Sequence, residues 1–157
     1  MQDEKIVLIT GASSGIGAAT ANKVIEAGHK AVITARSIDK LNAIVDRWGD
    51  DKVLAVKADV TNLSDIEHVV AQAKDTFGRI DVVFANAGTG ANQPGIANGD
   101  PEEWKTMLDV NINALLYTAK ASLPALREAK GQFIITSSIA GKITLKGSVY
   151  GASKWFA

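Results

Sequence analysis

The chain has 157 residues, with 17 Lys+Arg against 17 Asp+Glu, so its formal net charge is zero, and 46% of its residues are hydrophobic. These proportions are ordinary for a soluble globular protein, and there is no basic excess to neutralise the phosphates of a nucleic acid. The absence of cysteine excludes disulfides, iron–sulfur clusters, cysteine-based zinc sites and a thiol nucleophile. Only two histidines are present, without HExxH spacing, and we expect no metal centre.

The first ten residues, MQDEKIVLIT, do not form a secretory signal, because their apolar run is four residues long and follows two acids. No apolar run approaches the ~20 residues that a membrane span requires. From these features and the length we expect one cytoplasmic domain over residues 1–157, with no nucleic-acid or membrane partner.

Five short apolar runs are typical of β-strands, and they lie at 6–9, 31–35, 53–56, 80–84 and 133–136. The runs are nearly continuous rather than alternating, which indicates strands covered on both faces, as in a parallel sheet. Between them, residues 38–48 and 66–77 show apolar side chains at helical spacing. This alternation predicts right-handed βαβ units and an α/β, doubly wound parallel sheet.

Local signals refine the helix boundaries. Ser64-Asp65-Ile66-Glu67 has the pattern of a capping box, which predicts a helix that begins just after Ser64. Asp100-Pro101 combines a capping residue with proline at the first helical position. Pro124 lies inside a long helical stretch from 102 to 129 and predicts a kink or break near Leu123. The glycine-rich stretch from 86 to 100 has no helical or strand period, and we expect it to be a functional loop.

The strongest local motif is TGASSGIG at 10–17, directly after the first predicted strand. Gly11 permits a tight turn, Gly15 lets the main chain approach a pyrophosphate, and Gly17 lets the following helix pack closely on the strand. The helix amino terminus offers free N–H groups to phosphates. The turn is not a Walker A loop, because GxxxxGK[ST] is absent. We expect it to bind a dinucleotide, the alternative being a turn that only packs, through the following residues: Gly11, Ser13, Ser14, Gly15, Ile16 and Gly17.

The end of the second strand predicts which dinucleotide is bound. A site for NAD(H) places an acid about 20 residues after the glycines, whereas an arginine accommodates the 2′-phosphate of NADP(H). Here Ala35 lies 18 residues after Gly17 and is followed by Arg36 and Ser37. The guanidinium can make paired hydrogen bonds to a phosphate. We therefore expect a preference for NADP(H) over NAD(H), the alternative being that Arg36 is only a solvated charge at a strand end.

Taken together, four spaced motifs resemble the short-chain dehydrogenase/reductase family. They are TGxxxGxG at 10–17, Ala-Asn-Ala-Gly at 85–88, Ser138 after the fifth strand, and Tyr-Gly-Ala-Ser-Lys at 150–154. The resemblance covers essentially the whole chain. It implies a Rossmann-like fold of strand order 3-2-1-4-5 and an oxidoreductase that transfers a hydride between NADP(H) and a small carbonyl or secondary alcohol. It also implies a homodimer or homotetramer for the full-length protein.

The resemblance assigns roles residue by residue. Tyr150 is implied as the general acid/base, Lys154 as its electrostatic partner, Ser138 as the residue that orients the carbonyl, and Asn111 as support for a proton relay. It further implies cofactor contacts, in addition to Tyr150 and Lys154, by Asp59, Val60, Asn86, Ala87 and Gly88. The family's usual Asn-Asn-Ala-Gly here begins with Ala85, which we expect to alter strand bonding more than chemistry. Asp59 as a helix cap is the alternative for that residue.

The proposed chemistry agrees with the residue types. Carbonyl reduction builds negative charge on oxygen, so the site needs a proton donor and hydrogen bonds that strengthen as the charge develops. An unperturbed tyrosine ionises near pH 10, too high for efficient proton exchange at neutral pH. Tyr150 and Lys154 are four residues apart and share a helix face, so the lysine charge favours the phenolate. In isolation such a pair would more often be a packing residue and a solvated charge.

The resemblance also suggests that the polypeptide is incomplete. The family continues with further strands and a loop that covers the substrate, whereas the sequence stops three residues after Lys154. We expect the 157 residues alone to turn over weakly or not at all, because water exclusion would be poor. The alternatives to an active oxidoreductase are a non-catalytic dinucleotide-binding protein, an inactive fragment of such an enzyme, or an epimerase or dehydratase on the same fold.

Overall fold

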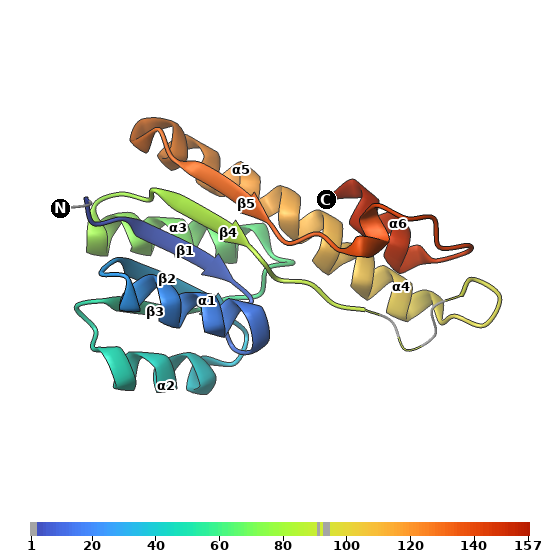
Figure 1. Ribbon diagram of the computed structural model, residues 1–157, viewed down its shortest axis with the longest axis horizontal. Helices are drawn as coiled ribbons and strands as arrows, with labels where there is room; N and C mark the ends of the chain where they lie inside the picture. The colour runs from blue at the N-terminus through green and yellow to red at the C-terminus, as the bar shows by residue number, and fades with distance from the viewer. Residues whose placement is uncertain (1–2, 91, 93–94) are drawn as a thin grey trace.

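The computed structural model describes residues 3–90, 92 and 95–157. Its centre is a sheet of five parallel strands in the order β3-β2-β1-β4-β5 (Figure 1). The strands are β1 (Ile6–Thr10), β2 (Lys30–Ala35), β3 (Val53–Lys57), β4 (Val82–Ala85) and β5 (Gln132–Ile135). The predicted α/β fold and strand order are both confirmed.

Helices cover the two faces of the sheet and divide the core in two. On one face α1 (Gly15–Glu26) and α2 (Ile38–Trp48) pack against β1, β2 and β3. On the other face α3 (Leu63–Phe77) and α5 (Ala114–Ala129) contact β3, β4 and β5. Alternate residues of each strand point to opposite faces. Ile9 therefore belongs to the part of the core under α1 and α2, and Leu8 to the part under α3 and α5. This explains the continuous apolar runs of β1 and β2.

The edge strand β5 differs from its predicted environment. Its apolar run predicts burial on both faces, but Ile134 is 45% and Ile135 39% exposed, and only Phe133 packs against the core. The reason is its position, since β5 lies at the end of the sheet order and contacts α5, whereas α1 and α2 lie over the other strands.

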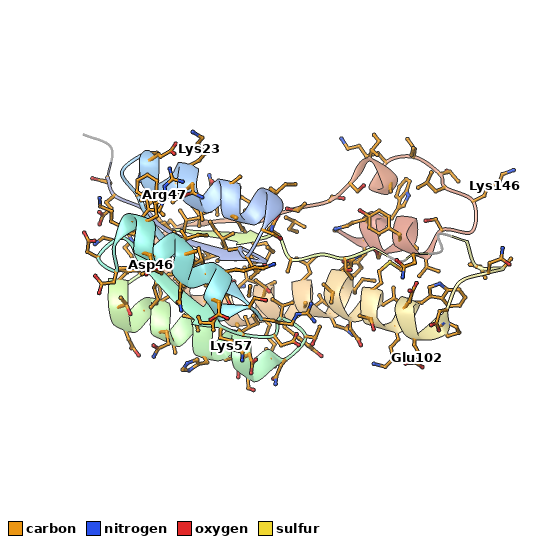
Figure 2. The ribbon with its side chains drawn as sticks, turned by 90° about the horizontal axis from the view of Figure 1, so that it is seen from below. Lys23, Asp46, Arg47, Lys57, Glu102 and Lys146 are labelled. Carbon is orange, nitrogen blue, oxygen red and sulfur yellow. The ribbon has the colours of Figure 1, made fainter. Side chains whose placement is uncertain are left out.

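Beyond the carboxyl ends of the strands, the chain extends into a second, smaller layer. It contains α4 (Pro101–Leu108), the five-residue π-helix η1 (Asp109–Asn113), the 3-10 turn η2 (Ile139–Gly141) and α6 (Val149–Phe156). Figure 1 shows α4 and α6 together at this end, with the loop after β4 running out to them. In Figure 2, Glu102 and Lys146 lie at this end, away from the helices that carry Lys23 and Arg47.

Two helix boundaries depart from the sequence predictions and one agrees. The predicted capping box is wrong, because α3 begins at Leu63 and its cap is Asn62, whose side chain accepts from Ser64 N. The break near Leu123 is also wrong, because α5 continues through Pro124. Proline has no N–H, so Pro124 cannot donate the helical hydrogen bond to the carbonyl of Lys120. Both residues are exposed, so water can satisfy that carbonyl instead. The start at Asp100-Pro101 is confirmed, with Asp100 accepting from Glu102 N at 3.0 Å.

Candidate functional site

The glycine-rich turn between β1 and α1 takes the shape that its sequence predicts. Gly11 has φ +67° and lies so close to the next loop that a Cβ added there would be 2.8 Å from Ala87 Cα. Gly15 has φ +54°, and a Cβ added there would meet nothing within 4 Å. Gly17 is buried, and an added Cβ would be 2.7 Å from Asn86 Nδ2. Gly11 and Gly17 thus permit close packing, whereas Gly15 combines a left-handed backbone with open space.

The amino terminus of α1 is free of competing negative charge. Its N-cap residue Ser14 makes no side-chain capping hydrogen bond, and its first turn carries no acid. Ser14 and Ile16 are exposed at this end, Ile16 to 62%. An anion placed there would meet unpaired N–H groups and the positive end of the helix dipole.

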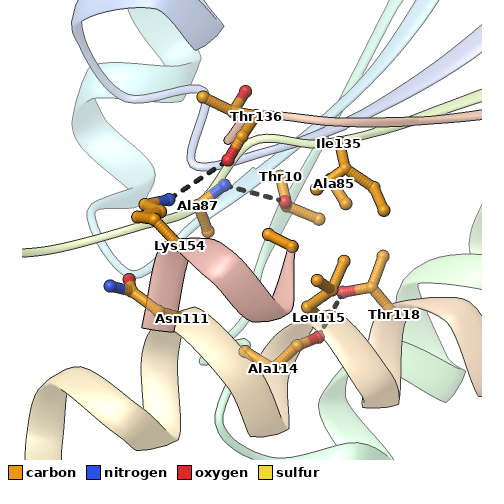
Figure 3. A pocket seen from close by; sticks show the side chains of 11 residues that line it. Thr10, Ala85, Ala87, Asn111, Ala114, Leu115, Thr118, Ile135, Thr136 and Lys154 are labelled. Atoms are coloured by element: carbon orange, nitrogen blue, oxygen red, sulfur yellow. Dashed lines mark hydrogen bonds between the residues drawn. The ribbon is translucent and has the colours of Figure 1, made fainter. Parts of the chain in front are cut away.

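Asn86 joins the carboxyl ends of three strands. Its backbone N–H donates to Thr10 Oγ1 at 3.1 Å, its Nδ2 donates to Thr10 O at 3.1 Å, and its Oδ1 accepts from Thr136 Oγ1 at 3.1 Å. Ala87 N also donates to Thr10 Oγ1, at 3.2 Å (Figure 3). These bonds align β1, β4 and β5 at the edge where doubly wound folds bind ligands.

A cleft of about 900 Å³ lies along this edge. It is large enough for a dinucleotide-sized ligand, since small-molecule sites are typically about 300–1,000 Å³. The predicted site residues that line it are Gly11, Ser13, Ser14, Ile16, Arg36, Ser37, Asp59, Val60, Asn86, Ala87, Gly88, Tyr150 and Lys154. Four predicted residues are not among its lining: Gly15, Gly17, Asn111 and Ser138.

Arg36 and Asp59 lie on the same stretch of the cleft, at the ends of β2 and β3. Asp59 Oδ1 accepts from Thr61 N at 2.9 Å and from Thr61 Oγ1 at 2.7 Å. These two hydrogen bonds, and to a lesser degree the charge of Arg36, lower the pKa of Asp59. Asp59 therefore stabilises a turn, and the cap of the following helix is Asn62 instead.

Lys154 is 93% buried, with only 7% of its surface exposed, and it has two close neighbours. Its Nζ donates to Thr136 O at 3.1 Å, just after β5 (Figure 3). A Cβ added to Gly88 would be 3.3 Å from the same Nζ and 3.4 Å from Asn111 Oδ1. The ammonium is thereby fixed between the loop after β4 and the end of β5. Behind it lies a cavity of about 10 Å³, lined among others by Lys154, Asn111, Thr10 and Thr118.

Tyr150 lies in the first turn of α6, one turn before Lys154. The Lys154 Nζ is 6.0 Å from the centre of the Tyr150 ring. Ser148 caps this helix, its Oγ accepting from Gly151 N at 2.9 Å. The loop after β4 also reaches this point, because Ile96 N donates to the carbonyl of the residue before Ser148, at 3.1 Å. The helix start that carries Tyr150 is therefore fixed by its own cap and by a distant loop.

Asn111 is brought next to Lys154 but makes no contact with the large cleft. It lies in η1, is 3% exposed, and its side chain is held by Thr89 and Ser153. Ser138 does not line the large cleft, whereas Tyr150 and Lys154 do. Its Oγ accepts from Ala140 N at 3.2 Å and caps η2, and the cleft is lined by its neighbour Ser137.

Three residues of the site were not predicted from the sequence. Thr89, Thr136 and Asp109 all line the cleft. The pKa of Asp109 is lowered by the hydrogen bond from Lys105, at 2.9 Å, and then by that from Asn113. The position of Thr136 at a strand end could have indicated its place. The π-helix that carries Asp109 has no sequence pattern of its own.

Residues 3–90, 92 and 95–157 carry neither a membrane-spanning helix nor a metal-binding cluster of side chains. No helix there is both long and apolar enough to span a membrane. No group of three or more His, Asp or Glu side chains there could hold a metal ion.

Comparison with known proteins agrees with this arrangement. The family model for short chain dehydrogenases matches residues 5–157. An uncharacterized oxidoreductase of Staphylococcus aureus is 39% identical over 153 residues, which are 96% of this chain and 66% of that protein. An uncharacterized oxidoreductase of Listeria monocytogenes is 41% identical, over 96% of this chain and 62% of that protein. The chain thus spans about two thirds or less of the length of these relatives.

A solved structure, an alcohol dehydrogenase from Thermococcus sibiricus complexed with 5-hydroxy-NADP, superposes with a TM-score of 0.91 at 31% identity, over 99% of this chain and 67% of that one. The family match extends over every described helix and strand, from β1 to α6. The chain therefore belongs to the short-chain dehydrogenase family.

Proposed function

We propose that residues 1–157 form one NAD(P)-binding unit of an oxidoreductase that interconverts a small carbonyl and a secondary alcohol, with NADP(H) as the preferred cofactor. The observation that carries the proposal is the placement of Tyr150 and Lys154 on the same cleft as the glycine-rich turn. A binding protein without catalysis needs the turn but has no use for a buried ammonium beside a phenol.

The residues of the cleft fit a dinucleotide. The open space at Gly15 and the acid-free start of α1 suit a pyrophosphate, which would be bound by backbone N–H groups. Arg36 and Ser37 also line the cleft and would hold a 2′-phosphate. Asp59 lines the same part of the cleft, and its Oδ1 is occupied by hydrogen bonds from Thr61. Among similar structures, the Thermococcus sibiricus enzyme is complexed with 5-hydroxy-NADP, and a short chain dehydrogenase/reductase from Burkholderia phymatum (28% identical, TM-score 0.90, 98% of this chain and 56% of that one) is in complex with NAD.

When bound, a nicotinamide cofactor supplies the hydride to a carbonyl carbon or takes it up from an alcohol carbon. Tyr150 then donates its phenolic proton to the carbonyl oxygen during reduction, or accepts the proton during oxidation. Lys154 places a positive charge beside that phenol, with Nζ 6.0 Å from the centre of the ring, and its burial and its bond to Thr136 O keep it in place. Well-placed acid–base catalysis of this kind contributes on the order of 10²–10⁴ in rate.

Ser138 and Asn111 have supporting roles in this proposal. Ser138 lies after the end of β5, and its Oγ accepts one hydrogen bond, which leaves its own hydrogen to donate to a substrate oxygen. Asn111 contacts the loop after β4 and the helix that carries Tyr150. Assembly into a homodimer or homotetramer and a cytoplasmic location, both expected from the sequence, stay predictions.

The test is Tyr150→Phe in the full-length protein, measured with NADPH and a panel of small aldehydes and ketones. We expect the rate of NADPH oxidation to fall at least a hundredfold, because the proton donor is lost, while the dissociation constant for NADPH changes less than threefold. Tyr117→Phe, on α5, is the matched control and should keep the rate. An unchanged rate in Tyr150→Phe would remove Tyr150 from the mechanism.

A further inference from the structure

Ser153 connects two parts of the site through a continuous line of hydrogen bonds. Its hydroxyl is fully buried and accepts from Asn111 Nδ2 at 3.0 Å, and it donates to the Tyr150 carbonyl at 2.8 Å. The other end of the Asn111 amide is held by Thr89, whose N–H donates to Oδ1 at 2.9 Å and whose carbonyl accepts from Nδ2 at 2.9 Å. The line therefore runs from the loop after β4, through η1, into the first turn of α6.

The direction of each bond follows from the groups involved. A serine hydroxyl has a single hydrogen, and here the Tyr150 carbonyl can only accept it. The Ser153 oxygen must then be an acceptor, which requires the Asn111 amino group, and not its oxygen, to face Ser153. Thr89 N–H, a donor, requires the amide oxygen on the opposite side. Both hydrogens of Asn111 Nδ2 are used, so this side chain has no donor left for a substrate or cofactor.

We propose that Ser153 is a positioning residue, which acts through Asn111 to hold the loop at Gly88–Thr89 in register with the helix that carries Tyr150 and Lys154. The proposal rests on the proposed function, which gives Tyr150 and Lys154 the catalytic roles that this positioning serves. It assigns Ser153 a role of its own in the Tyr-Gly-Ala-Ser-Lys segment, besides the adjacent Lys154.

The surrounding contacts show why a small shift would reach the ammonium. Asn111 Oδ1 and Lys154 Nζ both pack against Gly88. A Cβ added to this glycine would be 3.4 Å from Asn111 Oδ1 and 3.3 Å from Lys154 Nζ. If Ser153 loses its hydroxyl, one buried N–H of Asn111 loses its acceptor. Unsatisfied buried donors cost about 1–3 kcal/mol, so the amide rotates or admits water. Either change moves the loop against which Lys154 is placed.

The chain offers a closely matched control in Ser122. Like Ser153, Ser122 is fully buried in a helix and donates its hydroxyl to a carbonyl of the preceding turn, that of Thr118, at 2.6 Å. Unlike Ser153, it has no bond to Asn111. Ser122→Ala therefore removes the same hydroxyl-to-carbonyl bond without touching the line through Asn111.

The experiment compares Ser153→Ala with Ser122→Ala in the full-length protein, by amide hydrogen exchange and by steady-state kinetics with NADPH and the best carbonyl of the panel. We expect Ser153→Ala to increase the exchange rate of the Thr89 N–H at least tenfold and to lower kcat about tenfold, with KM for NADPH changed less than twofold. Ser122→Ala should leave all three quantities unchanged. In an Asn111→Ala background, Ser153→Ala should add no further increase at Thr89, because the line is already broken.

The outcomes separate this inference from the proposed function. Unchanged Thr89 exchange in Ser153→Ala would overturn the inference, and so would an equal change in Ser122→Ala or an additive effect in the Asn111→Ala background. An unchanged kcat alongside an inactive Tyr150→Phe would overturn the inference alone. If Tyr150→Phe keeps its rate, the proposed function fails, while the Thr89 exchange still decides whether Ser153 holds the loop.

Discussion

Gly88 lies directly against the ammonium of Lys154, so closely that a Cβ on the glycine would be 3.3 Å from Nζ. The two residues are 66 positions apart, one in the loop after β4 and the other in α6. The contact explains why a glycine follows Asn86 and Ala87 at this point even though its backbone does not have a positive φ. Space beside a buried charge, rather than backbone conformation, is what the position requires.

The first prediction follows from this contact. In the full-length protein, Gly88→Ala should displace the Lys154 ammonium by a few tenths of an ångström and lower kcat several-fold to tenfold, with little change in the unfolding midpoint. Gly95→Ala is the control, because an added Cβ there meets nothing within 4 Å. Steady-state kinetics and thermal unfolding of both variants provide the check. Equal kcat in the two variants would show that the contact at Gly88 has no catalytic consequence.

The second prediction concerns cofactor preference. Arg36→Asp should weaken NADPH binding by about 10–100-fold, because a hydrogen bond to a charged group contributes about 1.5–3 kcal/mol, and should leave NADH binding unchanged or improved. Isothermal titration with each cofactor measures both constants. Arg47→Asp, at the opposite end of α2 and over the Trp48 ring, is the control for a general change of charge (Figure 2). Preference that stays the same in Arg36→Asp would remove the assignment of NADP(H).

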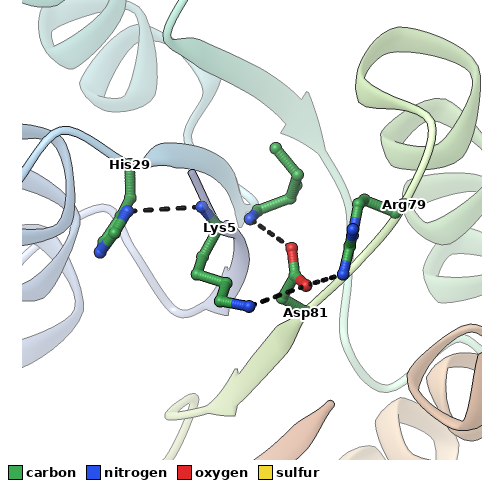
Figure 4. A network of polar contacts seen from close by, with 5 residues as sticks. Lys5, His29, Arg79 and Asp81 are labelled. Carbon is green, nitrogen blue, oxygen red and sulfur yellow. Dashed lines mark hydrogen bonds and ion pairs between the residues drawn. The ribbon is translucent and has the colours of Figure 1, made fainter. Parts of the chain in front are cut away.

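The third prediction concerns a buried carboxylate at the opposite edge of the sheet. Asp81 is 3% exposed, accepts from Ile6 N at 2.9 Å, and pairs with Arg79 at 2.5 Å and with Lys5 at 3.8 Å (Figure 4). Asp81→Ala leaves the Ile6 N–H without its partner and should lower the unfolding free energy by about 1–3 kcal/mol.

Urea denaturation measures this loss, and Asp75→Ala is its control on the exposed surface of α3. We expect the Asp75 variant to stay within about 0.5 kcal/mol of the original chain. Cofactor affinity should be unchanged in both variants, because Asp81 lies at the start of β4 and the cleft at its end. An Asp81 variant as stable as the Asp75 variant would contradict the prediction.

The fourth prediction is a pH dependence. The pKa of Asp59 is lowered in the folded chain by its hydrogen bonds from Thr61, so its contribution to stability is present above the unfolded pKa of about 4. That contribution is lost as the pH falls through the lower folded pKa, because the protonated carboxyl is a poorer acceptor. Unfolding free energies measured from pH 5 to pH 2 should therefore fall less steeply in Asp59→Asn than in the original chain. Parallel curves would show that these hydrogen bonds do not carry the effect.

Periodicity and glycine spacing were enough to predict the parallel sheet and the turn before α1, whereas the strand order was implied by the family resemblance. These features depend on interactions within a few residues or on one rule for a whole strand, that a continuous apolar run is buried on both faces. Even so, the rule was wrong for β5, because its burial depends on whether it lies at the edge of the sheet. The helix boundaries at Ser64 and Pro124 were wrong because a neighbouring residue caps better or because solvent compensates for a lost bond.

For the site, the sequence by itself determined which chemical groups are present: the glycines of the turn, Arg36, and the Tyr150–Lys154 pair one helical turn apart. Only the tertiary structure decided which of them share a cleft, that Ser138 caps a turn while Ser137 lines that cleft, and that Ser153 and Thr89 hold Asn111 from both sides. The physical reason is that hydrogen bonds and close contacts between residues 22 to 66 positions apart depend on how strands and helices are brought together. Local sequence patterns carry no information about such distances.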